Sequence, residues 1–276
     1  MGFPPWHGHA TRLAMQDRIK PLQGVMNFRD FGHYLSRHGG RVRRGALYRS
    51  AHFAEATDTD RSALDQLGVA LLADLRRPEE RAQEPNRWPS AGVAVLTNDA
   101  GVNTPPPHLA AVNAADWSPA GVEGYMRATY GAYPFEPRYV ALFGGFLRGL
   151  ADGEGAAVVH CAAGKDRTGC LCALTLRLVG VADDETIADY LITNQTIDWD
   201  KRVPAMRERI AARYGAAPGD AALHKMLGVQ EDFLAAYFAA IAEEFASLER
   251  YAEVVLDLDA ARLNRLRARL LAESGA

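Results

Sequence analysis

The first half of the chain consists of short apolar runs, and the second half shows longer helical patterns. Brief apolar runs between turn residues are typical of buried strands. They occur at residues 24–31, 46–49, 69–75, 93–97 and 156–160. Helical patterns at 59–67 and 138–151 lie between them. This alternation predicts an α/β fold in which helices cover both faces of a central sheet.

From residue 168 onward the pattern is helical throughout. We expect helices at 169–179, 183–194, 202–214, 231–245 and 260–272. Asp183 is the expected N-cap of the second of these, because its carboxylate can accept a backbone N–H. Twelve of the fourteen prolines lie at or before Pro137, so few of them interrupt the later helices. The C-terminal half is therefore predicted to be largely helical.

One segment between the two halves is irregular. Residues 102–137 hold three consecutive prolines at 105–107 and several small residues, which is typical of a lid over a site or of a surface insertion. With 276 residues, the chain is long enough for one large domain. We predict a single domain at 20–272, with a sheet-bearing core at 20–165, a helical part at 166–272 and an N-terminal extension at 1–19.

Composition narrows the classes of function. Hydrophobic residues make up 48% of the chain and charged residues 24%, as in ordinary globular proteins. The net charge of −3 gives no indication of nucleic-acid binding. The N-terminus has no apolar segment of the kind found in signal peptides. We therefore expect a cytoplasmic protein, with signal-independent export left open. Arginines and leucines alternate at 262–271, which predicts a helix docked on the core or, alternatively, a peripheral membrane contact.

The last predicted strand leads into a loop that combines a cysteine, a lysine and an arginine. It reads His160-Cys161-Ala162-Ala163-Gly164-Lys165-Asp166-Arg167-Thr168-Gly169. A loop this short must curl, so its N–H groups can converge above the cysteine and, with the helix N-terminus, form an anion site. Arg167 adds a planar fork that matches two phosphate oxygens. The same field favours the nucleophilic thiolate form of Cys161.

This loop resembles the His-Cys-x5-Arg-Thr/Ser-Gly signature of the cysteine-dependent protein tyrosine and dual-specificity phosphatases. The full stretch is closer still to the bacterial atypical tyrosine phosphatases that also accept phosphoinositides. Residues 27–32, 47–50 and 74–76 are similar to that family as well. The resemblance covers roughly residues 20–272 and implies a central sheet of the tyrosine-phosphatase type. His33 is a departure, since a second glycine is expected after Gly32.

The resemblance implies a role for each loop residue. Cys161 would be the nucleophile, Arg167 would bind the phosphoryl oxygens, and Thr168 could donate its hydroxyl to the leaving thiolate. The expected substrate-binding residues are His160, Ala162, Ala163, Gly164 and Lys165, with His160 orienting the loop rather than transferring protons. No metal or other cofactor is expected.

The general acid has three candidates. Trp88-Pro89 is followed by Ser90, so the Trp-Pro-Asp setting of many relatives is missing. Asp166 precedes Arg167 in the loop and is the favoured candidate, as in the myotubularin-type lipid phosphatases that this arrangement resembles. Asp74 ends a predicted central strand, where active-site residues of open α/β sheets collect. Asp99 follows another strand.

Lys165 bears on the substrate. Lysine is scarce, since only four of the 31 basic residues are lysines, so one inside the loop suggests extra positive charge for a multiply phosphorylated ligand. The alternative is a lysine that points to solvent. The expected function is hydrolysis of phosphate monoesters through a phosphocysteine, with phosphotyrosine in proteins as substrate and broader phosphoserine, phosphothreonine or phosphoinositide activity.

Three alternatives stay open at this point: a primary phosphoinositide phosphatase, a non-catalytic phosphate-binding module, and a rhodanese-like sulfurtransferase. The partner expected in each phosphatase reading is a phosphorylated protein or a phosphoinositide. The sequence indicates no obligate partner subunit. Cys170 and Cys172 are expected to pack as small apolar residues, with a redox partnership with Cys161 as the alternative.

Overall fold

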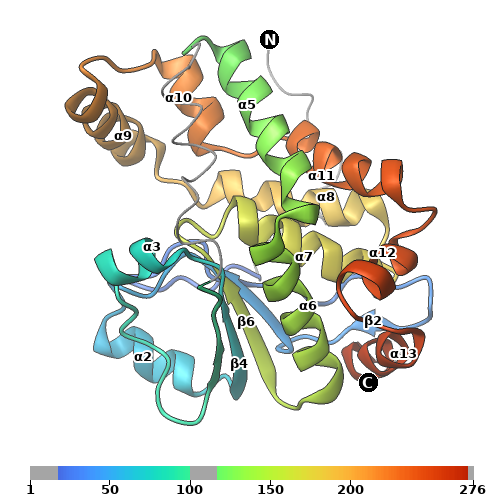
Figure 1. The fold of residues 1–276 in the computed structure, drawn as a ribbon. Coiled ribbons are helices and arrows are strands. Elements are labelled where there is room, and N and C mark those ends of the chain that lie inside the picture. The colour runs from blue at the N-terminus through green and yellow to red at the C-terminus, as the bar shows by residue number, and fades with distance from the viewer. Residues whose placement is uncertain (1–17, 100–116, 273–276) are drawn as a thin grey trace, which may run out of the picture.

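The computed structural model describes residues 18–99 and 117–272, and its centre is a five-stranded sheet in the order β1-β3-β6-β4-β5 (Figure 1). The strands are β1 (Arg29–Asp30), β3 (Leu47–Ser50), β4 (Val69–Asp74), β5 (Ala94–Leu96) and β6 (Ala156–His160). Strands β3, β6, β4 and β5 run parallel, and β1 pairs antiparallel with β3. Strand β6 is buried along its whole length and reads as a nearly continuous apolar run, as expected for a central parallel strand.

Helices surround this sheet, as the sequence predicted. The helices and 3-10 turns are α2 (Asp58–Asp65), α3 (Pro78–Gln83), α5 (Pro119–Ala132), η1 (Tyr133–Phe135), α6 (Pro137–Asp152), α7 (Asp166–Leu178), α8 (Asp183–Leu191), η2 (Ile192–Gln195), α9 (Trp199–Tyr214), α10 (Asp220–Leu227), α11 (Glu231–Glu244), α12 (Leu248–Val255) and α13 (Ala260–Leu270). The main core lies between the sheet and α6 and α7, and a second core joins the sheet to α2. The α/β fold with a largely helical C-terminal half is confirmed.

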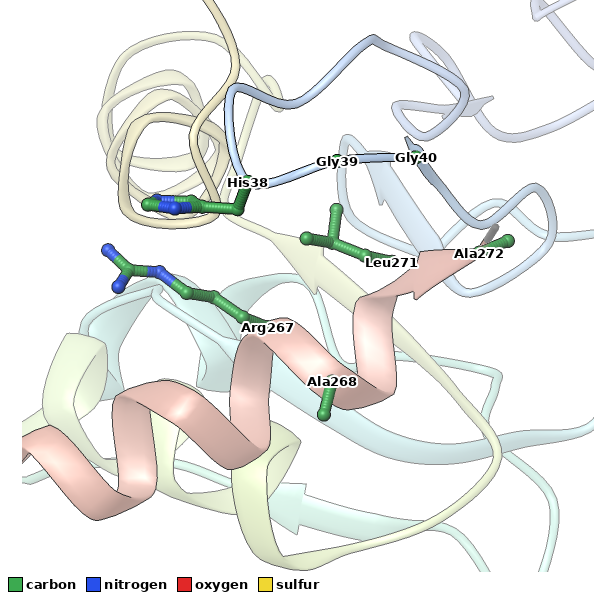
Figure 2. A pocket seen from close by; sticks show the side chains of 7 residues that line it. All are labelled: His38, Gly39, Gly40, Arg267, Ala268, Leu271 and Ala272. Carbon is green, nitrogen blue, oxygen red and sulfur yellow. The ribbon is translucent and has the colours of Figure 1, made fainter. Parts of the chain in front are cut away.

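A small second sheet joins distant parts of the chain. Strand β2 (Arg41–Val42) pairs antiparallel with β7 (Leu271–Ala272), a pairing that the sequence did not indicate. A surface cavity of about 410 Å³ opens beside it, between His38 and Arg267 (Figure 2). This cavity does not include Cys161.

The strand predicted at 24–31 is too long. Only Arg29–Asp30 is extended and paired. Asn27 has a positive φ of 58°, which breaks a strand. Gly24 lies against the Glu55 carbonyl so closely that an added Cβ would come within 1.8 Å of its oxygen. The apolar residues before β1 therefore pack in a turn.

The prediction for Asp183 is also wrong in detail. The N-cap of α8 is Ala182, which makes no side-chain cap, and Asp183 is the first helical residue. The Asp183 carboxylate instead accepts a hydrogen bond from Arg177 Nε at 2.6 Å. Its negative charge in the first turn of α8 still stabilises the helix, because it interacts favourably with the positive end of the helix dipole.

The prediction that residues 102–137 are irregular is wrong for residues 119–132. Residues 119–132 form α5, which begins with Pro119 at its first position and is capped by Ser118. Proline is well suited to that position, because its missing N–H would have no partner there. Val122, Met126 and Tyr130 bury one face of α5 in the main core. The three prolines at 105–107 lie outside the described residues.

The C-terminal helix α13 docks on the core. Its leucines Leu263, Leu266 and Leu270 are buried, while Arg262 and Arg265 bind Asp152 through Nε at 3.1 and 3.2 Å. These contacts show the docked helix that the amphipathic pattern predicted, and the peripheral membrane contact stays a prediction. Among the described residues, no helix combines the length and apolarity needed to cross a bilayer.

Candidate active site

The loop between β6 and α7 lies at the carboxyl ends of the parallel strands. Gly164 has a φ of 66°, and an added Cβ would lie 2.3 Å from the Ser50 carbonyl, so only glycine fits there. The Gly164 carbonyl accepts hydrogen bonds from Asn27 Nδ2 at 2.8 Å and Arg49 Nη2 at 3.1 Å. The Ala162 carbonyl accepts one from the His52 N–H at 3.2 Å. With the Ala163 carbonyl, which lies 3.5 Å from Asn27 Nδ2, three loop carbonyls are thus bound from outside the loop.

The loop amides have a different environment. The N–H groups of residues 162–167 donate no hydrogen bond to any acceptor within residues 18–99 and 117–272. Buried or half-buried N–H groups without partners are rare, because each costs about as much as a lost hydrogen bond. They lie beside Cys161, which is 2% exposed, and at the N-terminus of α7. Such a nest of N–H groups is suited to an anion.

Arg167 is held in position by Glu80, a residue of α3. Its Nη1 and Nη2 donate to the two Glu80 carboxylate oxygens at 2.6 and 2.8 Å, and Nη1 lies 3.3 Å from the Leu75 carbonyl. Burial lowers the pKa of Arg167, but Glu80 and Cys161 raise it by more. The guanidinium is therefore a fixed cation near the thiol. The sequence reasoning missed Glu80, although it lies just beyond the carboxyl end of β4, where site residues of such sheets collect.

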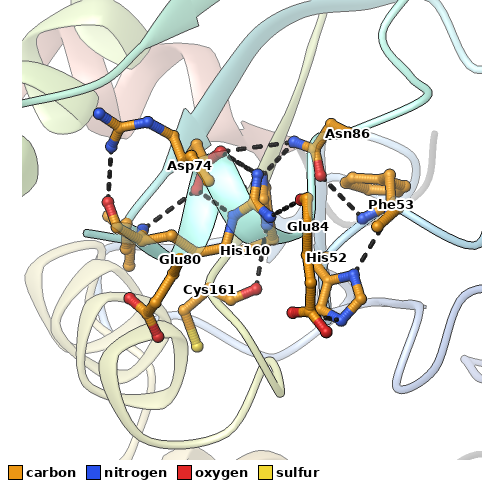
Figure 3. A network of polar contacts seen from close by, with 12 residues as sticks. His52, Phe53, Asp74, Glu80, Glu84, Asn86, His160 and Cys161 are labelled. Atoms are coloured by element: carbon orange, nitrogen blue, oxygen red, sulfur yellow. Dashed lines mark hydrogen bonds and ion pairs between the residues drawn. The ribbon is translucent and has the colours of Figure 1, made fainter. Parts of the chain in front are cut away.

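His160 is buried behind the cysteine, in the polar network of Figure 3. Asn86 Oδ1 accepts the Phe53 N–H at 2.9 Å, so Asn86 Nδ2 is the atom that donates to His160 Nε2, at 3.1 Å. With Nε2 accepting, Nδ1 carries the proton and donates to the Cys161 carbonyl at 3.1 Å. Burial and Arg76 lower the pKa of His160 to about 4, against the raising effect of Asp74. The imidazole is neutral and braces the loop.

Asp74 is committed to an arginine. Its carboxylate accepts Arg76 Nε at 2.9 Å and Arg76 Nη2 at 2.7 Å, and both side chains are buried. Burial alone would raise the pKa of Asp74, but His160 and Arg76 lower it. Asp99 is exposed and pairs with Arg81. Both carboxylates are thus paired with arginines.

Asp166 is the first residue of α7, and the buried Tyr130, which is itself hydrogen-bonded to Tyr190, holds its carboxylate. Tyr130 of α5 donates its hydroxyl to Asp166 Oδ1 at 2.7 Å, and its oxygen lies 2.6 Å from the Tyr190 hydroxyl. Burial and Asp166 raise the pKa of Tyr130, so it remains a donor. The segment expected to be an irregular lid or insertion thus supplies a helical residue to the site, which no local sequence signal indicated.

Lys165 does not point to solvent. Its ammonium donates to the Met226 carbonyl in the last turn of α10 and lies 3.5 Å from Asp166 Oδ1. A cation suits the negative end of a helix. Lys165 therefore ties the loop to α10 while keeping its charge next to Asp166.

The neighbouring Thr168 and cysteines are fully buried. The Thr168 hydroxyl has no hydrogen-bond partner among the described residues, so it is available to a group above the loop. Burial raises the pKa of Cys170, and it raises that of Cys172 to about 12. All three cysteines are free, and the latter two pack in the main core as neutral thiols.

Buried charged side chains also support the loop. Arg49 Nη1 lies 3.0 Å from Asp189 Oδ2, and Arg29 Nη2 donates to the Asp189 carbonyl at 3.0 Å. Both guanidiniums are fully buried around this single carboxylate. Within the described ranges, no group of three His, Cys, Asp or Glu side chains could hold a metal ion.

Comparison with known proteins gives a family match over almost the whole chain. The model of the tyrosine phosphatase family matches residues 20–272. A protein of Cupriavidus necator, provisionally named a tyrosine-protein phosphatase, is 32% identical over 243 residues, 87% of this chain and 84% of that protein. The triple specificity protein phosphatase PtpB of Mycobacterium tuberculosis is 29% identical over 291 aligned positions, covering 92% of this chain and 99% of the relative.

Proposed function

The chain belongs to the tyrosine phosphatase family, and we propose that it hydrolyses phosphate monoesters through a phosphocysteine formed on Cys161. Phosphotyrosine in proteins is the proposed principal substrate, with broader activity on phosphoserine, phosphothreonine or phosphoinositides. The observation that carries this proposal is a set of N–H groups at 162–167 that have no partner among the described residues. They belong to the same loop as the Cys161 thiol and the fixed Arg167 fork.

In the first proposed step, the Cys161 thiolate attacks phosphorus from the side opposite the ester oxygen. The S–P bond forms as the P–O bond to the leaving group breaks, and the leaving oxygen takes a proton from a general acid. The loop N–H groups and Arg167 bind the non-bridging oxygens, on which charge is spread in the transition state. Glu80 fixes the orientation of the Arg167 fork before substrate arrives, so less ordering is needed in the transition state.

In the second step, water attacks phosphorus, the S–P bond breaks, and the sulfur leaves as a thiolate. The general acid, now deprotonated, takes the proton from the attacking water. The Thr168 hydroxyl, which lacks a partner among the described residues, donates a hydrogen bond to the departing sulfur. Inorganic phosphate then leaves, and the loop returns to its starting state.

We assign the general acid to Asp166. Asp74 accepts three hydrogen bonds from Arg76, and Asp99 is paired with Arg81. Asp166 adjoins Arg167, and its carboxylate is oriented by Tyr130. A general acid must lie within hydrogen-bond reach of the leaving oxygen, and the position of Asp166 next to Arg167 supports this role.

The test is a steady-state assay of a phosphotyrosine peptide, a phosphoinositide and thiosulfate with a metal chelator present. We expect phosphate release from the peptide, no sulfur transfer, and no turnover by Cys161→Ser. Phosphate binding should survive in Cys161→Ser, because the loop amides and Arg167 remain. Arg167→Ala should lose both phosphate affinity and turnover. Appreciable turnover by purified Cys161→Ser would refute the assignment of the nucleophile.

A second candidate function is primary phosphoinositide hydrolysis. It rests on the charge of Lys165, which lies 3.5 Å from Asp166 inside the loop, and on the triple specificity named for one relative. A headgroup with several phosphates would benefit from a second cation beside Arg167. The ratio of phosphoinositide to phosphotyrosine turnover in the same assay distinguishes the two candidates.

A further inference from the structure

A second cluster of positive charge surrounds a cavity at the other end of the sheet. The cavity has a volume of about 260 Å³ and is lined by Arg18, Lys20, His33, Arg44 and Tyr48, with Asp30 in its wall. Tyr48 lies two residues before Ser50, which pairs with His160 beside the catalytic loop. Gly45, also in the lining, precedes β3, and no residue of the Cys161 loop lines the cavity. The cavity is therefore separate from that loop.

Three cations at this cavity have no ion-pair partner in the part of the chain that the structure describes. Within residues 18–99 and 117–272, no carboxylate forms an ion pair with Arg18, Lys20 or Arg44. Arg18 is buried, lies 3.9 Å above the Tyr34 ring and donates to the Gly32 carbonyl, so its guanidinium is fixed in place. Glu185 acts on Arg18 only from beyond ion-pair distance. Uncompensated charge on a fixed arginine is what an anion site requires.

The single carboxylate of the lining is already occupied. Asp30 accepts the N–H groups of Gly32 and Gly45, each at 2.7 Å, one on each carboxylate oxygen. The Tyr48 hydroxyl has no hydrogen-bond partner among the described residues, and burial and Asp30 raise its pKa, so it remains a donor. The cavity thus offers cations and a donor hydroxyl, while its carboxylate serves to join two loops.

His33 reports on the field in this cavity. Its φ of 68° lies in the left-handed region, where the resemblance to the family leads us to expect glycine. Burial, Arg44, Arg41 and Arg18 lower the pKa of His33, and Asp30 opposes them. Burial, the largest of these effects, and the three arginines therefore disfavour the protonated imidazole, in agreement with the cations that line the cavity.

We propose that this cavity is a second anion site, which binds a compact phosphate group carrying two negative charges or more. Its volume is just below the range of roughly 300–1,000 Å³ typical of pockets for larger organic ligands, so a small polar ligand fits it best. The cavity beside β2 and β7 gives a contrast, because its Arg267 is neutralised by Glu249 at 3.1 Å. Free phosphate and the phosphate group of an uncleaved ester share the chemistry that this cavity recognises.

The test follows the His33 imidazole by NMR in the full-length protein, with the resonance assigned from its loss in His33→Gln. Pyrophosphate, inorganic phosphate, an alkyl phosphonate and chloride are added at matched ionic strength. We expect pyrophosphate and phosphate to raise the pKa of His33 by about one pH unit, since opposite charge within 4–6 Å has effects of this size. The phosphonate stands for an ester that cannot be cleaved, and its binding would assign the site to esters as well. Equal shifts with all four anions would mean ionic screening alone and would overturn the proposal.

Charge-removing variants locate the site. Lys20→Gln and Arg44→Gln should each weaken the pyrophosphate affinity read at His33 by about fivefold or more, as expected for a lost charge-assisted contact. Arg250→Gln removes an equally exposed charge from α12 and should leave that affinity unchanged. Phosphatase activity should be the same in all three variants. Unchanged affinity in both cavity variants would also overturn the proposal, whatever the outcome for catalysis at Cys161.

Discussion

Replacing His160 by asparagine should remove a specific pH dependence of folding. In the folded chain burial lowers the pKa of His160 to about 4, whereas an unfolded histidine titrates near 6.5. The unfolded chain therefore binds this proton more readily. The contribution of neutral His160 to the free energy of unfolding is complete above about pH 6.5. It declines as the pH falls and is fully lost below about pH 4.

The magnitude follows from these two values. At pH 5 the loss amounts to about 2 kcal/mol of the free energy of unfolding, and at pH 7 it is close to zero. The asparagine amide can keep the hydrogen bond to the Cys161 carbonyl but does not titrate. His160→Asn is thus a matched variant, in which the other histidines still titrate and their effects cancel in the difference.

The assay is urea unfolding of both proteins at pH 7 and pH 5. We expect the free energy of unfolding of the native protein to fall by about 2 kcal/mol more than that of His160→Asn between these two pH values. Any lower absolute stability of the variant does not affect this comparison. An identical pH dependence for the two proteins would refute the neutral, buried state that we derive for His160.

Three further predictions concern catalysis. Tyr130→Phe should lower kcat about tenfold for a serine or inositol phosphate and much less for an activated aryl phosphate, because only a poor leaving group needs the proton of Asp166. An equal loss of kcat on both substrates would show that Tyr130 has no part in positioning the general acid. Glu80→Gln should lower kcat/KM about ten- to a hundredfold by releasing the fork of Arg167, and unchanged kinetics would show that the ion pair has no part in orientation. Lys165→Ala should reduce phosphoinositide turnover more than phosphotyrosine turnover, with a gap that narrows as salt rises; equal losses would exclude the lipid preference.

The sequence was sufficient to predict the elements and the loop that depend only on residues adjacent in the chain. The strand at 156–160, the helix that follows it and the loop between them form one continuous segment, so local pattern was sufficient. Prolines were treated only as interruptions, yet Pro78, Pro119 and Pro137 each stand at the first position of a helix. A fixed φ suits that position, which explains why α3 and α5 were missed.

The supporting residues could not be found in the same way. Glu80, Asn86 and Tyr130 reach the loop from segments 36 to 87 residues away in the chain. Each is an ordinary polar residue in its own segment, and its role depends on the tertiary fold, which brings these distant segments to the loop. The cation cavity is similar, since Arg18 and Arg44 come together only through the pairing of β1 with β3.

The central claim is a covalent phosphoryl group on Cys161, and rapid quenching during turnover tests it most directly. Trypsin should release residues 149–165, which contain Cys161 and His160 but neither Cys170 nor Cys172. We predict that mass spectrometry of protein quenched during hydrolysis of a phosphotyrosine peptide finds one phosphoryl group in this fragment, placed on the cysteine by fragmentation. The same fragment from Cys161→Ser should carry none. A phosphoryl group on His160, or full turnover without any adduct on Cys161, would contradict the account.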